Sequence, residues 1–154
     1  MSIAAPLKDG LRTMLYRCGA LGAWHRSRNR RALTVLMFHR VLPADDPAFA
    51  LAEREFTFTL GGFRRTLDFV QRHYSVVSLG DLQAACQKQR PLPPNPMLIT
   101  FDDGWRDNHD VALPLLRRYD LPATIFLSTD FIGSDSGFWW QNLGDYLSTT
   151  DFDE

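Results

Sequence analysis

Two adjacent carboxylates, Asp102 and Asp103, directly follow an apolar run in the pentapeptide Thr100-Phe101-Asp102-Asp103-Gly104. The run predicts a buried strand, and ligands and catalytic groups gather at the carboxyl ends of such strands in parallel α/β folds. Two ionised carboxylates held there repel each other unless a cation is bound. Because consecutive side chains leaving a strand point in different directions, one carboxylate could bind a metal while the other acts as a base. The alternative is an Asp-Asp-Gly turn that caps the next helix.

The rest of the chain alternates apolar runs with helical patterns, which is typical of a parallel sheet, open or closed into a barrel. The strongest runs are apolar on both faces, which predicts strands buried on both sides. Ser78, followed by Asp81 three residues later, predicts a capping box, and the polar segment 42–55 is expected to be a loop. The expected strands lie at 33–38, around 76–77, at 97–101 and at 123–127, and the expected helices lie at 62–73, 80–89, 108–118 and 138–147.

The pentapeptide resembles the first motif of the polysaccharide deacetylase family, which comprises the NodB-homology or family 4 carbohydrate esterases. Other segments resemble this family in the same order, over roughly residues 33–145. The resemblance implies an α/β fold, the N-terminal part of a deacetylase-type (β/α) barrel that is incomplete, in a domain over 32–154. The other segments are Leu36–Val41, Phe63, Leu67–Phe69, Val76–Leu79, Leu121–Leu127 and Phe138–Trp140, the last resembling an insertion of bacterial members.

The resemblance also implies a reaction and roles for the two carboxylates. The family hydrolyses N- or O-acetyl groups on glycans, so the chain is expected to be a hydrolase of carbon–nitrogen bonds other than peptide bonds. By position in the motif, Asp102 would be the catalytic base and Asp103 a ligand of a divalent metal, expected to be zinc. Such a metal lowers the pKa of its bound water toward neutrality. A glycan or polysaccharide is therefore the expected substrate.

The chain departs from the family at the second motif, a His-x-x-x-His pair. Its four histidines are His25, His39, His73 and His109, and no two of them are four residues apart. A catalytic zinc usually has three protein ligands and a water. We therefore expect the chain to be truncated before the histidine pair and to be inactive by itself. The alternative is a natural short form that binds glycan or acts at a membrane surface without catalysis.

Two further residues are candidates for the rim of the site. His39 ends the first expected strand, so it is expected near the carboxylates, with a structural hydrogen-bonded histidine as the alternative. Arg106 follows the pentapeptide closely and could neutralise the carboxylates or contact sugar. Asp107 or Asn108 is expected to cap the following helix.

The basic charge of the chain is concentrated at its start. Residues 1–31 carry seven Lys and Arg against one Asp, a net charge of +6, whereas residues 32–154 carry a net charge of -7. The apolar spacing over roughly 6–22 predicts an amphipathic helix, followed by a basic linker to residue 31. This segment either packs on the domain or contacts an anionic membrane through residues 6–31. No nucleic-acid partner is expected, since no binding-module pattern accompanies the charge.

The composition is that of a globular protein of one domain. Of 154 residues, 45% are hydrophobic and 23% are charged, which excludes a disordered chain. The apolar run 18–24 is far shorter than the roughly 20 residues of a membrane span, and Arg12 and Arg17 interrupt any signal-peptide core. We therefore expect a cytoplasmic or membrane-peripheral location. Cys18 and Cys86 are expected to be free thiols, with pairing as the alternative.

Overall fold

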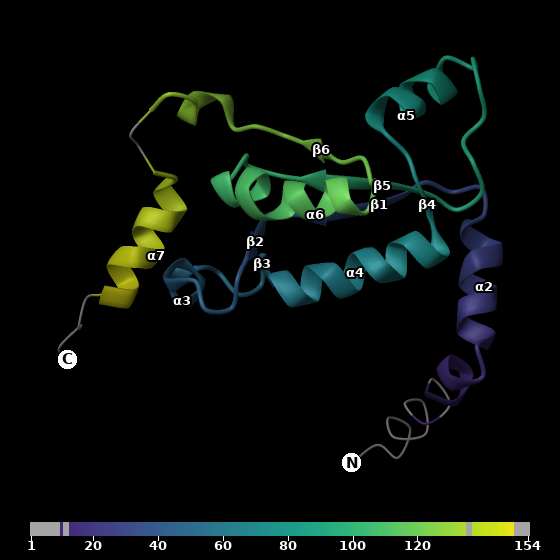
Figure 1. Cartoon of the computed structure of the whole chain (residues 1–154), viewed down its shortest axis with the longest axis horizontal. Helices are drawn as coiled ribbons and strands as arrows, with labels where there is room; N and C mark the ends of the chain where they lie inside the picture. The colour runs from purple at the N-terminus through teal and green to yellow at the C-terminus, as the bar shows by residue number, and fades with distance from the viewer. Residues whose placement is uncertain (1–9, 11–12, 135–136, 150–154) are drawn as a thin grey trace, which may run out of the picture.

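The computed structural model describes residue 10 and residues 13–134 and 137–149, and shows a parallel sheet with helices (Figure 1). Helices α2 and α7 lie at opposite ends of the molecule, and α4 runs along the sheet between them. The strands are β1 (Thr34–Phe38), β2 (Arg40–Leu42), β3 (Thr57–Thr59), β4 (Ser75–Val76), β5 (Pro96–Phe101) and β6 (Thr124–Ile125). The helices are α2 (Ala20–Asn29), α3 (Pro47–Leu51), α4 (Leu60–His73), α5 (Leu79–Cys86), α6 (Leu113–Arg118) and α7 (Trp139–Thr149).

Strand β5 is the centre of the main sheet. It pairs in parallel with β1 along its whole length, from Thr34 opposite Met97 to Phe38 opposite Phe101. On its other side, β4 pairs with its beginning and β6 with its end, both in parallel. All six residues of β5 are buried. The parallel α/β fold expected from the sequence is confirmed.

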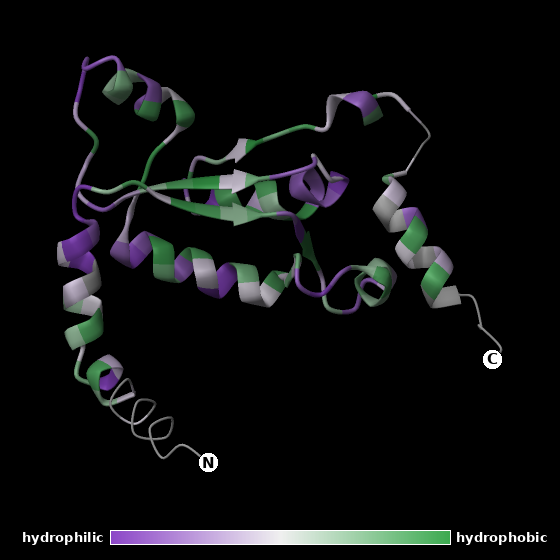
Figure 2. Ribbon diagram, turned by 180° about the vertical axis from the view of Figure 1, so that it is seen from behind, coloured by the Kyte–Doolittle hydropathy of each residue, from purple (hydrophilic) through white to green (hydrophobic). Residues whose placement is uncertain are grey.

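Helices α4 and α6 cover one face of this sheet. The rings of Phe38 in β1, Phe63 in α4 and Phe101 in β5 pack with centroids 5.1 to 5.9 Å apart. Leu115 and Leu116 of α6 join the same buried cluster. The ribbon coloured by hydropathy shows the apolar colour of β1 and β5 and the alternating apolar and polar stripes of α4 (Figure 2). Helices on one face of a parallel sheet are the arrangement of a (β/α) barrel.

The opposite face of β1 is not covered by the described residues, and here the expected burial on both faces is wrong. Strand side chains alternate between faces, and Val35 and Met37 are 54% and 56% exposed. The prediction failed because an apolar strand sequence permits burial of both faces but does not determine which elements cover them. Whether the faces are buried depends on what packs against them.

The prediction of a buried strand at 123–127 is also wrong, both in the extent of the strand and in its burial. Only Thr124 and Ile125 pair as β6, and they pair with the last residues of β5. Ile125, Phe126 and Leu127 are 42%, 53% and 56% exposed. Within the described residues the main sheet ends at this strand, so its apolar side chains have few neighbours.

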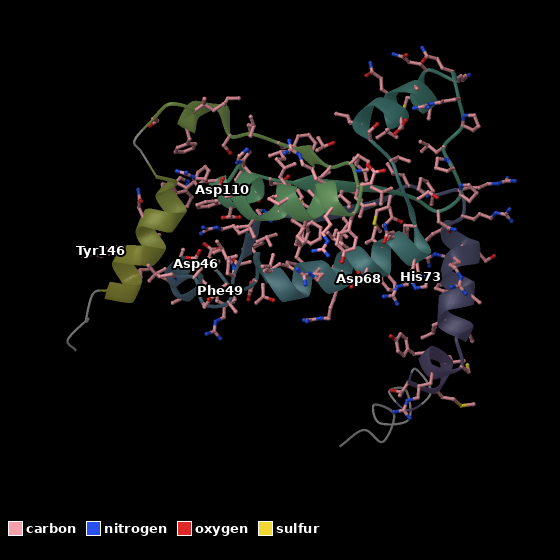
Figure 3. The ribbon with its side chains drawn as sticks, in the orientation of Figure 1. Asp46, Phe49, Asp68, His73, Asp110 and Tyr146 are labelled. Carbon is pink, nitrogen blue, oxygen red and sulfur yellow. The ribbon has the colours of Figure 1, made fainter. Side chains whose placement is uncertain are left out.

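The segment predicted as a loop over 42–55 contains short regular elements. Strands β2 and β3 pair in parallel, from Arg40 opposite Thr57 to Leu42 opposite Thr59. Between them, α3 has Pro47 in its first turn, and Asp46 caps it by accepting a hydrogen bond from the N–H of Ala48 at 2.8 Å (Figure 3). Elements of three to five residues are too short to show a period in the sequence.

Other helix predictions hold with shifted ends. The Ser78–Asp81 capping box is present and begins α5, which ends at Cys86 rather than at residue 89. The helix expected over 108–118 consists of a π-helical turn, Asn108–Ala112, followed by α6. The helices expected over 62–73 and 138–147 correspond to α4 and α7.

The basic N-terminal segment differs from the predicted helix and linker. Residues 13–17 are helical and a turn follows at Cys18 and Gly19. Helix α2 then carries Arg26 and Arg28, two of the basic residues that we expected in a linker. Residues 6–9 and 11–12 of the predicted helix lie outside the described residues. None of the described helices is both long and apolar enough to cross a membrane. Cys18 and Cys86 are exposed free thiols, as expected.

Candidate functional site

The two motif carboxylates stand where the carboxyl ends of β1 and β5 meet. The backbone N–H of Asp102 donates to the carbonyl of Phe38 at 2.9 Å, which continues the β1–β5 pairing by one residue. The chain then turns through Asp103 and Gly104, whose φ angles are 70° and 78°. Two consecutive left-handed residues turn the backbone sharply away from the strand, and glycine adopts this conformation without steric cost.

Gly104 also lies close to Leu127. An added Cβ at Gly104 would lie 2.6 Å from Cδ2 of Leu127, so the leucine side chain would have to move. The same turn accepts a backbone hydrogen bond, because the N–H of Ser128 donates to the carbonyl of Asp103 at 3.3 Å. The segment after β6 therefore packs directly on the motif turn and holds it in place.

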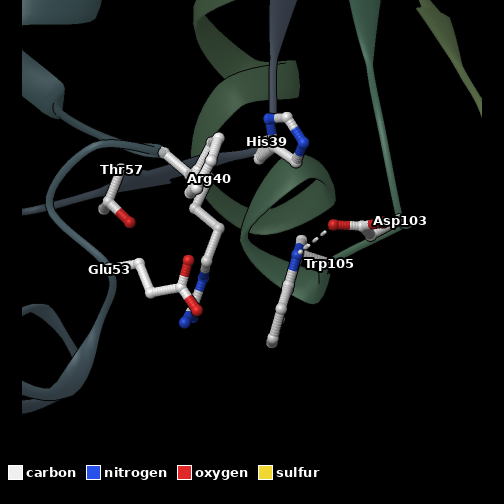
Figure 4. Close-up of a pocket in the computed structure, with 7 residues that line it drawn as sticks. His39, Arg40, Glu53, Thr57, Asp103 and Trp105 are labelled. Atoms are coloured by element: carbon white, nitrogen blue, oxygen red, sulfur yellow. Dashed lines mark hydrogen bonds between the residues drawn. The ribbon is translucent and has the colours of Figure 1, made fainter. Parts of the chain in front are cut away.

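The carboxylates of Asp102 and Asp103 have different partners, in agreement with the divergence expected from the strand geometry. Oδ2 of Asp102 lies 3.9 Å from Nε2 of His39, and both side chains are partly exposed. Oδ2 of Asp103 accepts a hydrogen bond from Nε1 of Trp105 at 3.2 Å (Figure 4). His39 is therefore next to the carboxylate that the resemblance designates as the base, as its position at the end of β1 suggested.

A cavity of about 300 Å³ adjoins these residues. It combines motif residues with residues from β2, β3 and the loop between them. Asp102 is not part of its wall, whereas Asp103 is. Its labelled lining residues in Figure 4 are His39, Arg40, Glu53, Thr57, Asp103 and Trp105, and Phe56 completes the wall.

Asp107 does not cap a helix, contrary to expectation. Its buried carboxylate accepts one hydrogen bond from Nε of Arg40 at 2.9 Å and another from the N–H of Val41 at 3.0 Å. The guanidinium of Arg40 lies 4.1 Å from the centroid of the Trp105 ring, in cation–π contact. Asp107 thus fixes Arg40, and Arg40 fixes the indole that holds Asp103. A buried strand N–H without an acceptor costs more free energy than an uncapped helix terminus, because the helix terminus can bind water instead.

Asn108, the other expected cap, is also buried and makes no capping contact. Asn108 is 2% exposed. Neither its amide nitrogen nor its amide oxygen has a hydrogen-bond partner among the described residues.

Arg106 is not next to the two motif carboxylates. Its side chain is 92% exposed, and its Nε donates to Oδ2 of Asp110 at 2.9 Å. His109 lies beside the same carboxylate, with Nδ1 2.8 Å from Oδ1. Hydrogen bonds from His109 and Arg106 lower the pKa of Asp110 below its ordinary value. The expectation that Arg106 neutralises Asp102 and Asp103 is therefore wrong in this structure, while contact with sugar stays a prediction.

Two residues of the cavity wall, Glu53 and Thr57, were not predicted from the sequence. Glu53 lies in the segment expected to be a loop, and Thr57 lies just after it at the start of β3. Neither residue belongs to a motif. Their only sequence signal is that they follow the first strand, whose carboxyl end was expected at the site.

The described residues do not fit a complete zinc site. They contain no group of three or more His, Cys, Asp or Glu side chains that could hold one metal ion. Asp103 is a suitable carboxylate ligand, but a catalytic zinc needs about three protein ligands.

Comparisons with known proteins agree with this geometry. The family model described as Polysaccharide deacetylase matches residues 89–146. Over 111 residues the chain is 25% identical to YxkH of Bacillus subtilis (strain 168), which carries a polysaccharide deacetylase name, and the match covers 72% of this chain and 37% of YxkH.

Two solved structures are similar in both sequence and fold. One is IcaB from Ammonifex degensii, with 25% identity and a TM-score of 0.57 over 71% of this chain and 46% of that one. The other is a de-N-acetylase from Aggregatibacter actinomycetemcomitans, with 26% identity and a TM-score of 0.51 over 60% of this chain and 36% of that one. The chain spans less than half the length of each of these proteins and of YxkH. The two-aspartate motif, the parallel α/β fold and the sequence matches agree, and the chain is similar to a part of the barrel of polysaccharide deacetylases.

Proposed function

We propose that this chain supplies the two-aspartate part of a site that removes acetyl groups from a glycan. The observation that carries the proposal is the position of Asp102 and Asp103. They lie at the joined carboxyl ends of β1 and β5 and have separate partners, and Asp103 lines a cavity of about 300 Å³. A cavity beside a catalytic carboxylate is where a substrate group would bind.

Asp102 is the proposed general base. Water attacks the acetyl carbonyl carbon as Asp102 accepts its proton. The bond from that carbon to nitrogen or oxygen then breaks while the proton passes to the leaving atom, which gives acetate and a free amine or hydroxyl. His39, 3.9 Å from the Asp102 carboxylate, is proposed to orient it. Trp105 holds Asp103 through the indole N–H.

The family resemblance implies a divalent metal, and we propose zinc, with Asp103 as its ligand from this chain. Such an ion supplies a Lewis acid for the acetyl carbonyl. Because the described residues offer no three-ligand group, we assign no step to the ion. Its remaining ligands are proposed to come from outside the 154 residues, since the sequence has no His-x-x-x-His pair.

The test is acetate release from acetylated glycans by the protein isolated from its native source, with its intact mass measured on the same sample. We expect a mass above 17.6 kDa and activity that a chelator removes. Asp102→Asn should lower turnover by about a hundredfold or more, whereas Asp45→Asn, an exposed loop carboxylate, should leave it unchanged. Activity like that of the wild type in Asp102→Asn would contradict the assignment of the base.

A second candidate is a catalytically inactive module that binds glycan or a membrane surface. The missing histidine pair favours it, and so does α2, on which Trp24 is 57% exposed and lies in cation–π contact with Arg28. A native mass near 17.6 kDa without acetate release would favour this candidate. Salt-sensitive binding to anionic vesicles would assign the membrane role and a membrane-peripheral location. This binding should be lost when four arginines become Gln, namely Arg26, Arg28, Arg30 and Arg31.

A further inference from the structure

The cavity has a second side that the proposed reaction does not use. Glu53, Phe56 and Thr57 come from the β2–β3 segment and line the same space as Asp103. We call these three residues the Glu53 side of the cavity. Since β3 pairs with β2 at Arg40 opposite Thr57, this side is held by the backbone at a fixed position relative to the motif.

Thr57 is a buried polar residue of the cavity wall. The residue is 8% exposed, and its Oγ1 is buried without a hydrogen-bond partner in the described part of the chain. A buried hydroxyl without a partner destabilises a fold, so native structures rarely retain one without a reason. Figure 4 shows the Thr57 hydroxyl pointing toward Glu53. A ligand hydroxyl bound there would complete its hydrogen bonding.

The charges around the cavity favour a cation. His39 and Arg40 face it, but the guanidinium of Arg40 is already paired with Asp107, a buried carboxylate outside the cavity wall. The exposed side chain of Glu53 has no ion pair or hydrogen bond with any residue that the structure describes. Since Asp103 is the proposed metal ligand, Glu53 is the carboxylate of the wall that is available to a cation of the substrate.

The Phe56 ring adds an apolar surface. It is 47% exposed, and its centroid lies 5.0 Å from that of the His39 ring. A carboxylate, a hydroxyl and an aromatic face together match a sugar ring, which presents hydroxyl groups at its edge and C–H groups on its faces.

We propose that the Glu53 side of the cavity binds an amino sugar with a free, protonated amine, next to the acetylated unit that reacts at Asp102. Glu53 pairs with the amine, Thr57 hydrogen-bonds a ring hydroxyl, and Phe56 contacts the ring face. This proposal rests on the proposed deacetylation of glycans and specifies its substrate as a partly deacetylated polymer.

The test measures binding by the 154-residue chain, with no catalysis required. Calorimetric titrations compare three β-1,4-linked tetramers, of glucosamine, of N-acetylglucosamine and of glucose. We expect the glucosamine tetramer to bind about tenfold more tightly than the other two, because a charge-assisted hydrogen bond contributes about that factor. Glu53→Gln should remove this preference. Glu55→Gln, an exposed carboxylate of the same segment outside the cavity wall, should retain it.

Thr57→Val provides an independent test, because it removes the hydroxyl and keeps the shape. We expect several-fold weaker binding of the glucosamine tetramer together with an unchanged or higher Tm. A lower Tm with unchanged binding would show that the hydroxyl serves the fold alone and would overturn its role in binding.

Equal affinity for the three tetramers, no binding of any of them, or equal losses in Glu53→Gln and Glu55→Gln would overturn the proposal. These outcomes are separate from those of the acetate-release assay. Native protein that releases acetate while the chain shows no amine preference would leave the proposed function intact and reject only this inference.

Discussion

Strand β5 and the segment 123–127 have similar sequences but very different surroundings. Both are five- or six-residue apolar stretches with one threonine. β5 pairs with three strands and is buried at every position, whereas the other segment forms only two residues of strand, and Ile125, Phe126 and Leu127 are 42% to 56% exposed. The burial of an apolar stretch is therefore conferred by its neighbours.

This difference bears directly on the candidate site. The carboxylates follow the buried strand, so their backbone is fixed by β1 and by the core beneath it. The exposed segment contributes through its backbone and one side chain. Its strand β6 pairs with the end of β5, and the N–H of Phe126 donates to the carbonyl of Phe101 at 2.8 Å. Leu127 packs on Gly104. The site should thus depend strongly on β5 and weakly on the side chains after β6.

The largest expected effect comes from truncating one phenylalanine in each stretch. Phe101→Ala removes a ring that is 0% exposed and should lower the free energy of unfolding by about 3–5 kcal/mol. Phe126→Ala removes a ring that is 53% exposed and should cost less than about 1 kcal/mol. Urea unfolding of both variants checks the comparison, and equal losses would show that the segment 123–127 is buried in solution.

A second comparison uses two carboxylates three residues apart. Asp107→Ala leaves Arg40 and the N–H of the buried Val41 without their acceptor and should cost about 3 kcal/mol. Asp110→Ala breaks exposed contacts with Arg106 and His109 and should leave the unfolding midpoint unchanged. A comparable loss in both variants would contradict the difference in burial.

Much of the fold could be predicted from the sequence because its signals are local. The capping box at Ser78 needs only two residues three apart, and the buried face of α4 shows as a helical repeat. In the site, Asp102, Asp103 and His39 were found because strand ends and a family motif mark them. Glu53 and Thr57 could not be found, because their position depends on the three-residue pairing of β2 with β3, which leaves no period in the sequence.

Asp107 and Val35 show two other limits of sequence reasoning. Asp107 has the residue type of a helix cap, but its partners are more than 60 residues away along the chain. Val35 has the residue type of a core strand, but nothing that the structure describes covers its side chain enough to bury it. In both cases the outcome is decided by a long-range contact that the local sequence does not encode.

A third prediction tests the contact between the two regions. Gly104→Ala combines a φ of 78° with a Cβ 2.6 Å from Leu127 and should destabilise the fold by about 2–3 kcal/mol. Gly133→Ala, with a φ of 73° and open space around it, carries only the backbone cost of about 1 kcal/mol. Adding Leu127→Ala should recover part of the Gly104→Ala loss in a double-mutant cycle. Additive losses would mean that Leu127 does not lie against the motif turn.

The smallest expected effect is a change in the pKa of Tyr119. This residue directly follows α6, and its side chain contacts Asp68 of α4. The Tyr119 hydroxyl donates to Oδ1 of Asp68 at 2.7 Å, and this hydrogen bond raises the pKa of Tyr119 above its ordinary value of 10.0. In Asp68→Asn the pKa of Tyr119 should fall toward that value, as followed by absorbance titration of tyrosine with Tyr119→Phe identifying the signal. The pKa of Tyr74, raised by burial, should stay unchanged.

The sign of the accompanying stability change follows from the direction of the shift. A phenol whose pKa is higher in the folded than in the unfolded state stabilises the fold below the unfolded value, and this contribution is lost as the pH rises through the folded value. Wild-type protein should therefore lose more stability than Asp68→Asn above about pH 10. An identical pH dependence in both proteins would show that the hydrogen bond between Tyr119 and Asp68 is not formed in solution.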